Sequence, residues 1–150
     1  MGKRDWESIY REYEEIEHPS DIGLRFRGEN LEELFANAGL GMFSLITDIS
    51  RVEPAQNINI ELPGERSNED LVIMWLEKLL YFFEVENMAF SRIRVKKSGS
   101  SGLIAILYGE KIDYKKHNII NSIKAPTYHM LSIFKDADSG IWKGTVIFDV

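Results

Sequence analysis

The sequence contains no cysteine and no apolar run long enough to span a bilayer. The absence of cysteine excludes disulfides, thiolate metal sites and a cysteine nucleophile. The first residues, MGKRDWESIYREYEE, lack the apolar core of a secretory signal. We therefore expect a cytoplasmic protein that does not associate with membranes.

Common catalytic motifs are absent as well. There is neither a P-loop nor a dinucleotide-binding fingerprint, and no Gly-x-Ser-x-Gly nucleophile elbow. The three histidines, His18, His117 and His129, lack the i, i+4 spacing of a helical zinc motif. We interpret His117 and His129 as structural. Residues 136–140 resemble half of a calcium loop but lack its downstream glutamate, which predicts a simple turn.

Positive charge is scarce. The chain has 18 basic and 24 acidic residues and a net charge of -6. An acidic protein does not bind nucleic acid through its overall field, because phosphate contacts need lysine and arginine. Any contact with RNA therefore requires a protein partner or a local basic patch. The acidic balance fits docking on a basic partner, and it fits simple solubility equally well.

Two segments carry apolar residues at helical spacing, 31–46 and 68–85. The first follows Asn30, which is a good N-cap, and the second follows Ser67. Apolar residues surround most of the second segment, which predicts burial on more than one side. Gly39 and Gly41 lie inside the first helix, where each costs about 1 kcal/mol relative to alanine. Close approach to a sheet is the simplest reason for them.

Several other segments alternate between apolar and polar residues, as strands do. The predicted strands are 13–18, 21–27, 57–62, 90–97, 103–108, 119–125, 128–134 and 141–149. Two helices in such a chain predict a single α+β domain, with the helices packed on a largely antiparallel multi-stranded sheet. We place this domain at 15–150, after an N-terminal extension at 1–14 in which residues 3–13 form a marginal amphipathic helix or an ordered arm.

Two aspartates near the ends of the chain are the most informative carboxylates. Asp21 begins a predicted strand, and Asp149 precedes Val150, the last residue. Each aspartate alone is typical of a solvated end or a turn. If the fold brings both together with the carboxylate of Val150, the three negative groups repel one another unless a cation lies between them. Spacing along the sequence does not decide whether they meet.

Two short basic or polar segments have two possible interpretations. Lys124 opens the segment KAPTYH, whose density of polar groups suits a recognition surface or the start of a strand that contains proline. Its ammonium group is suited to a partner or a phosphate, or to a salt bridge within the domain. Lys96 and Lys97 precede a glycine-rich turn and indicate either a contact with an acidic partner or a solvated hairpin end.

Four blocks of the sequence resemble the archease family in order. HPSDIG at 18–23 resembles the family motif His-Thr-Ala-Asp-Ile/Val-Gly, and two further blocks resemble its two helices. The last block combines KAPTYH with the terminal FDV. The four blocks are 18–23, 31–43, 70–80, and 124–129 with 148–150. The resemblance extends over about 15–150, and Pro-Ser replaces the usual Thr-Ala without removing a carboxylate.

The resemblance implies a function. Archeases are small proteins that help RtcB-type RNA ligases become guanylylated and turn over repeatedly in tRNA splicing. They bind a divalent cation, described as Ca²⁺, and the ligands fall here on Asp21, Asp149 and Val150; Mg²⁺ or another divalent ion is an alternative. On this basis the protein is a ligase cofactor rather than an enzyme, and it reaches RNA indirectly through the ligase. We expect His18 and Lys124 to contact the partner.

Two other functions remain open. The first is a metal-dependent phosphoester hydrolase, although two aspartates and a chain end offer no obvious general base. The second is a general adaptor or chaperone for RNA-processing proteins, in which the cation is purely structural. Removal of the cation by a chelator separates the structural role, which predicts loss of the fold, from ligase activation, which predicts loss of stimulation with the fold kept.

Overall fold

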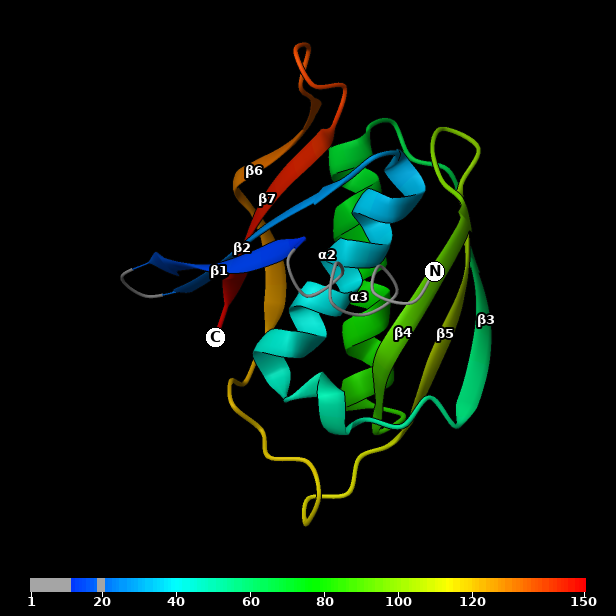
Figure 1. Ribbon diagram of the computed structural model, residues 1–150, viewed down its shortest axis with the longest axis vertical. Helices are drawn as coiled ribbons and strands as arrows, with labels where there is room; N and C mark the ends of the chain where they lie inside the picture. Colours follow the sequence, from blue (N-terminus) through cyan, green and yellow to red (C-terminus); the bar gives the residue numbers. More distant parts are fainter. Residues whose placement is uncertain (1–11, 19–20) are drawn as a thin grey trace.

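The computed structural model describes residues 12–18 and 21–150, with the side chains of Glu17 and His18 excepted. It consists of three layers, with two helices between two antiparallel sheets (Figure 1). The predicted α+β domain is therefore confirmed, and its strands divide into two sheets. The helix or arm predicted at 3–13 lies almost entirely outside the described residues.

The first layer is a four-stranded sheet with the order β1-β2-β7-β6, and all neighbouring strands are antiparallel. The other outer layer is a three-stranded antiparallel sheet with the order β3-β5-β4. The strands of the first sheet are β1 (Tyr13–His18), β2 (Asp21–Gly28), β7 (Trp142–Asp149) and β6 (Ala125–Lys135). Those of the second are β3 (Gln56–Leu62), β5 (Leu103–Lys111) and β4 (Met88–Lys97).

The middle layer contains α2 (Leu31–Ile46) and α3 (Asn68–Glu84), and a 3₁₀ turn, η2 (Ile49–Arg51), follows α2. The predicted caps are present: the Asn30 side chain accepts the Glu33 N–H at 2.8 Å, and the Ser67 hydroxyl accepts the Asp70 N–H at 3.1 Å. Each bond satisfies a backbone donor that has no partner inside the helix. The two helices therefore begin where the sequence predicts.

The glycines of α2 explain how this helix fits between the sheets. A Cβ atom at Gly39 would lie 2.8 Å from Ile93 of β4, whereas one at Gly41 would lie 2.8 Å from Leu24 of β2. Both distances are shorter than van der Waals contact. Residues two apart point to opposite sides of a helix, so each glycine admits one sheet. The predicted close approach is confirmed, and it involves both sheets.

The core fills the two interfaces between the layers. Trp75 of α3 is fully buried, and its indole N–H donates to the Phe35 carbonyl of α2 at 2.8 Å. This bond joins the helices at their contact and satisfies the buried indole. α2 packs on both β2 and β4, whereas α3 packs mainly on β6.

The strand predicted at 119–125 is wrong, except that Ala125 begins β6. Residues 119–124 form an extended crossing between the sheets, with one isolated bridge from Ile119 to Thr47. Its backbone pairs with the end of α2 instead, because the Ile120 N–H donates to the Ile46 carbonyl at 2.7 Å. The Asn121 amide donates to the Leu45 carbonyl at 2.7 Å. These bonds satisfy carbonyls that the helix end leaves without partners.

Candidate metal centre

The first residue of β2 lies directly opposite the last residue of β7. In the antiparallel pairing of these strands, Asp21 is the partner of Asp149. Side chains at such positions project from the same face, with Cβ atoms about 4.5–5.5 Å apart. The fold therefore brings together the two aspartates that are far apart in sequence.

Both aspartates project from the outer face of the four-stranded sheet, away from the helices. The neighbour of Asp149 on the inner face is Phe148, which is fully buried, whereas Asp149 is exposed and Asp21 is half-buried. This agrees with the alternation predicted for this strand. The carboxylates are thus accessible from outside.

An apolar row lies directly behind the carboxylates on the same face. It consists of Ile16, Gly23 and Ile147, which are paired across β1, β2 and β7. A Cβ atom at Gly23 would lie 3.0 Å from side-chain atoms of both isoleucines, so the missing side chain lets them close over the sheet. Ile147 is buried as a result. Such a row restricts water on one side of the carboxylates, which strengthens the electrostatic field that they create.

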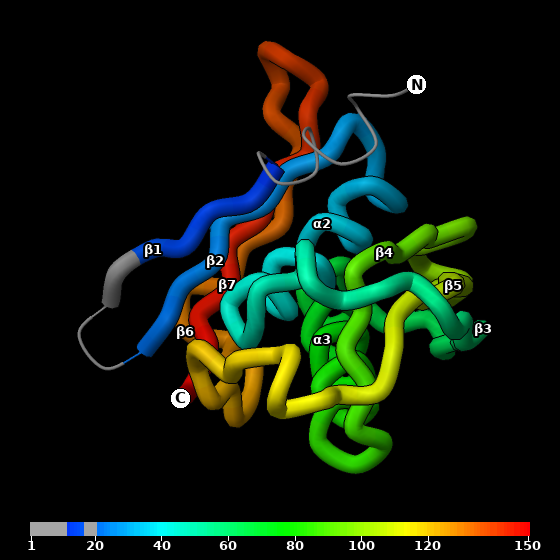
Figure 2. The backbone as a smooth tube through the Cα atoms, turned by 60° about the horizontal axis from the view of Figure 1, so that its bottom comes forward, coloured from blue at the N-terminus to red at the C-terminus, as the bar shows by residue number. Residues whose placement is uncertain are grey.

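The start of β6 lies beside the end of β7 and its Asp149. Ala125 pairs with Asp149, and the Lys124 N–H donates to the Asp149 carbonyl at 2.8 Å. Figure 2 shows the C-terminal end of the chain beside the segment that leads into β6. The Lys124 side chain is exposed, and no carboxylate described in the structure pairs with it. The backbone of Lys124 is therefore hydrogen-bonded to one residue of the aspartate pair, Asp149.

The rest of the KAPTYH segment holds β6 in place. The Thr127 hydroxyl donates to the Ile147 carbonyl at 2.8 Å, and the Tyr128 hydroxyl donates to the Asp70 carboxylate of α3 at 2.7 Å. The bond to Asp70, with smaller contributions from burial and the Asp70 charge, raises the pKa of Tyr128 to about 12. These two side chains fasten β6 to β7 and to α3, which is a structural role.

The histidines differ in their surroundings. The backbone of His18 pairs with Asp21 at the end of the β1–β2 hairpin, and its side chain lies outside the described part. His129 is exposed on β6. His117 is buried, as a structural histidine is expected to be, with 1% of its surface exposed.

A polar network surrounds His117 on the side of the three-stranded sheet. Its Nδ1 accepts the Asp113 N–H at 2.9 Å, and its Nε2 lies 3.0 Å from Glu110. The Glu110 carboxylate also accepts hydrogen bonds from the Lys116 ammonium group at 2.7 Å and from the Glu53 N–H at 2.8 Å. Although burial raises the pKa of Glu110, these hydrogen bonds and the Lys116 charge together lower it below its usual value. Sequence reasoning did not identify Glu110, because its partners come from separate segments.

The donor chemistry at the aspartate pair fits a hard divalent cation. Both side chains supply carboxylate oxygens, and Val150, which is 42% exposed, adds main-chain oxygens one residue further along. Like charges directly opposite each other destabilise a strand pair, and a cation between them reverses this effect. Within the described residues, no three side chains of histidine, aspartate or glutamate are grouped closely enough to hold a metal. The arrangement therefore offers two carboxylate side chains as candidate ligands, and a complete site would need main-chain oxygens as well.

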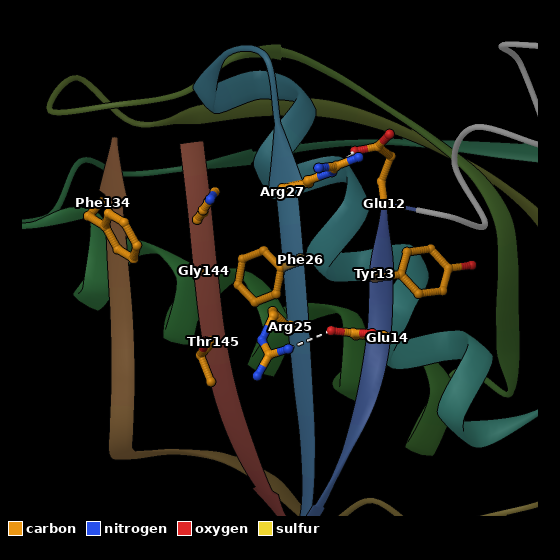
Figure 3. A pocket seen from close by; sticks show the side chains of 10 residues that line it. Glu12, Tyr13, Glu14, Arg25, Phe26, Arg27, Phe134, Gly144 and Thr145 are labelled. Carbon is orange, nitrogen blue, oxygen red and sulfur yellow. Dashed lines mark hydrogen bonds and ion pairs between the residues drawn. The ribbon is translucent and has the colours of Figure 1, made fainter. Parts of the chain in front are cut away.

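A groove of about 490 Å³ opens elsewhere on the same outer face (Figure 3). Arg25 and Arg27 of β2 line it, four or more residues along the strand from Asp21. Their guanidinium groups pair with Glu14 at 2.6 Å and Glu12 at 2.9 Å. The groove is thus separate from the aspartate pair, and carboxylates neutralise both of these arginines.

Comparison with known proteins decides the family. Residues 13–150 match the Archease protein family (MTH1598/TM1083). The chain belongs to this family. It is 37% identical to protein archease of Pyrococcus furiosus over 143 residues, which is 93% of this chain and 99% of that protein. It is 36% identical to protein archease of Methanosarcina barkeri over 146 residues, with 93% and 97% coverage.

A solved archease-family structure has the same fold. The solution structure of Methanobacterium thermoautotrophicum protein 1598 superimposes with a TM-score of 0.75 at 30% identity, and the match covers 93% of this chain and 99% of that one. Two helices on antiparallel sheets are therefore the archease architecture. No helix among the described residues is long and apolar enough to cross a membrane.

Proposed function

We propose that this archease activates an RtcB-type RNA ligase in tRNA splicing by presenting a divalent cation, expected to be Ca²⁺, at the aspartate pair. The observation that supports this most strongly is the pairing of Asp21 with Asp149 on the outer face of the sheet, where β2 begins and β7 ends. Two carboxylates that face each other across a strand pair repel one another, so the arrangement is better suited to binding a cation than to packing.

The chain's own residues have separate roles in this proposal. Asp21 and Asp149 hold the cation with side-chain oxygens, and Val150 adds main-chain oxygens. The bond from Lys124 fixes the Asp149 backbone, while its exposed ammonium group is directed to the ligase or to a phosphate. His18 adjoins Asp21 at the hairpin end and is a second partner contact. The cation supplies positive charge at the ligase's nucleotide site.

The geometry suits calcium better than magnesium. Ca²⁺ accepts six to eight oxygens in flexible arrangements, whereas Mg²⁺ demands near-ideal octahedral geometry. An exposed strand end with two opposed carboxylates leaves several positions for water and for groups from a partner. This openness also fits a cation that is presented to another protein.

The protein acts in this account as a cofactor of the ligase in the cytoplasm. A phosphoester hydrolase is less well supported, because the described ligand residues include no separate general base beside the aspartates. A general adaptor with a structural cation is tested by a chelator: it predicts loss of the fold, whereas ligase activation predicts loss of stimulation with the fold kept.

The direct test mixes the protein with an RtcB-type ligase, GTP and an excess of broken tRNA halves. The proposal expects the ligase alone to stop after about one turnover and to continue when the protein is added. Circular dichroism of the protein with and without a calcium chelator accompanies the assay. A ligase whose turnover is unchanged by the protein contradicts the proposed function.

A further inference from the structure

The outer face of the three-stranded sheet carries an ordered arrangement of side chains that the metal centre does not use. Strand pairing places three rows across this face, and each row contains one residue from β3, one from β5 and one from β4. The rows are Asn57-Tyr108-Arg92, Asn59-Ile106-Arg94 and Glu61-Ile104-Lys97. The helices cover the opposite face of this sheet, so the three rows face away from the rest of the molecule (Figure 1).

Positive charge is concentrated on β4 along one side of this face. Arg92, Arg94, Lys96 and Lys97 are all exposed, in a chain that has more acidic than basic residues. No carboxylate described in the structure pairs with Arg94, Lys96 or Lys97. The one acidic residue of the three rows, Glu61, lies on β3, two strands away from the cations. This contrasts with the groove on the other sheet, where the two arginines have carboxylate partners.

The central strand adds a flat, partly apolar surface beside the cations. Ile104 is 37% exposed, and Ile106 and Tyr108 are partly exposed. The Arg92 guanidinium lies 5.9 Å from the centre of the Tyr108 ring, which is within the range of a cation–π contact. On the far side, the exposed amides of Asn57 and Asn59 offer both donors and acceptors.

We propose that this face, defined by the rows from Arg92, Arg94 and Lys97 to Asn57 and Asn59, binds single-stranded RNA. Arg92 and Arg94 are alternate residues of β4, about 7 Å apart, and Lys97 follows beyond a bulge in the strand. The β4 cations therefore form a line along the strand that suits the repeating charges of a phosphate backbone. Tyr108 and the Arg92 plane provide surfaces on which bases stack. The amides on β3 reach the edges of bases that lie across the sheet.

Protection of an exposed strand edge does not account for the whole arrangement. Charged residues do prevent edge strands from pairing with other chains. This function requires neither a single sign of charge nor an aromatic ring in the same row. β3, the other edge of this sheet, carries amides and one glutamate instead. An RNA site accounts for the uniform sign on β4, the position of Tyr108 and the amides together.

This inference goes beyond the proposed function, because it requires neither the ligase nor the cation. It also differs from the expectation that RNA is reached through a partner. The two surfaces lie on opposite sides of the helix layer, so the protein can bind RNA while the aspartate pair faces a ligase. Failure of one proposal leaves the other standing.

The test measures binding of a short unstructured oligoribonucleotide to the full chain by fluorescence anisotropy between about 50 and about 200 mM salt. Three phosphate contacts predict a slope of about -2 in a plot of log affinity against log salt concentration, since each contact to a single strand contributes about -0.7. The triple variant Arg92→Gln, Arg94→Gln, Lys97→Gln is expected to bind at least about tenfold more weakly with a flatter slope.

Tyr108 separates stacking from a merely structural effect. Tyr108→Leu is expected to weaken binding roughly tenfold, whereas Tyr108→Phe keeps the ring and retains most of the affinity. Thermal unfolding identifies any variant that does not fold. Equal weakening by both substitutions contradicts a stacking role.

The matched control is Lys135→Gln, which removes one exposed positive charge from β6 on the other sheet. It is expected to leave RNA binding unchanged. The proposal is overturned if the wild-type protein shows no saturable binding at about 50 mM salt. It is also overturned if Lys135→Gln weakens binding as much as Arg94→Gln, or if a polyglutamate peptide of equal charge competes as well as RNA.

Discussion

Asp21 and Asp149 are direct partners in the antiparallel pairing of β2 and β7. Neither carboxylate is needed to fill the core, because both project from the outer face of the sheet. Gly23 and its two isoleucine neighbours provide a well-packed base immediately behind them. The segment 18–23 thus combines Asp21, the proposed ligand, with the glycine that lets the sheet close behind it.

The aspartate pair predicts opposite effects of Asp21→Asn with and without calcium. In chelator, the substitution removes like-charge repulsion and is expected to stabilise the protein by about 0.2–1 kcal/mol. In excess calcium the wild type gains about 2.7 kcal/mol at a concentration 100 times its dissociation constant, and the variant loses most of this gain. Urea unfolding under both conditions measures the reversal. A variant that is destabilised equally in both conditions rules out the cation site.

The network around Glu110 predicts a loss of stability in acid. Hydrogen bonds lower the pKa of Glu110 in the folded state below its usual value of 4.5, so the unfolded chain binds more protons. The stabilisation is therefore present above pH of about 4.5 and is lost as pH falls through the lower folded-state pKa. Glu110→Gln is expected to cost about 1–3 kcal/mol near neutral pH and much less in acid.

Urea unfolding of the wild type and Glu110→Gln at several pH values measures this effect. Glu61→Gln is a suitable control, since Glu61 is exposed on β3 and takes no part in the hydrogen bonds described for the network. A free-energy difference between wild type and Glu110→Gln that is the same at all pH values contradicts the interpretation.

Gly144 is predicted to be intolerant of a side chain. A Cβ atom there would lie 2.6 Å from Cζ of Phe26, a ring that is 1% exposed, and still closer to Cε2. Gly144→Ala is expected to destabilise the protein by about 1–3 kcal/mol through overpacking. This is the opposite of the usual effect, because alanine in the middle of a strand is normally more stable than glycine.

The double variant with Phe26→Leu tests this cause. Removing the ring makes room for the new methyl group, so the combined loss of stability is expected to be smaller than the sum of the single losses. Thermal or urea unfolding of the four proteins gives the coupling energy. Strict additivity would show that the ring is not what excludes the methyl group.

Local patterns predicted much of the fold. The caps at Asn30 and Ser67, the helix periodicity and the alternation in β2 depend on neighbouring residues, and all agree with the structure. The strand prediction at 119–124 was wrong because the structure of this segment depends on residues distant in the sequence. Its apolar residues look like a strand, yet its backbone groups are used at the distant end of α2. The division into two sheets was also beyond local patterns, because pairing joins segments from opposite ends of the chain.

For the candidate site too, the residues could be identified from the sequence, whereas their contacts depend on how distant segments pair. The resemblance named Asp21 and Asp149, and their register shows that they meet; the role of the pair in metal binding stays a prediction. The alternation of Arg92 and Arg94 is visible in the sequence, but the alignment of Arg92 with Tyr108 and of Arg94 with Ile106 depends on a β-bulge in β4 that no local pattern reveals. Glu110 likewise acquires its partners only when three segments meet.

The central claim is tested most directly by counting the turnovers of an RtcB-type ligase with Asp21→Asn in place of the wild type. Asp138→Asn, which removes a carboxylate from the exposed turn between β6 and β7, is the matched control. The account predicts that wild type and Asp138→Asn both sustain many turnovers, whereas Asp21→Asn, folded by circular dichroism, leaves the ligase at about one. Full stimulation by Asp21→Asn would contradict it.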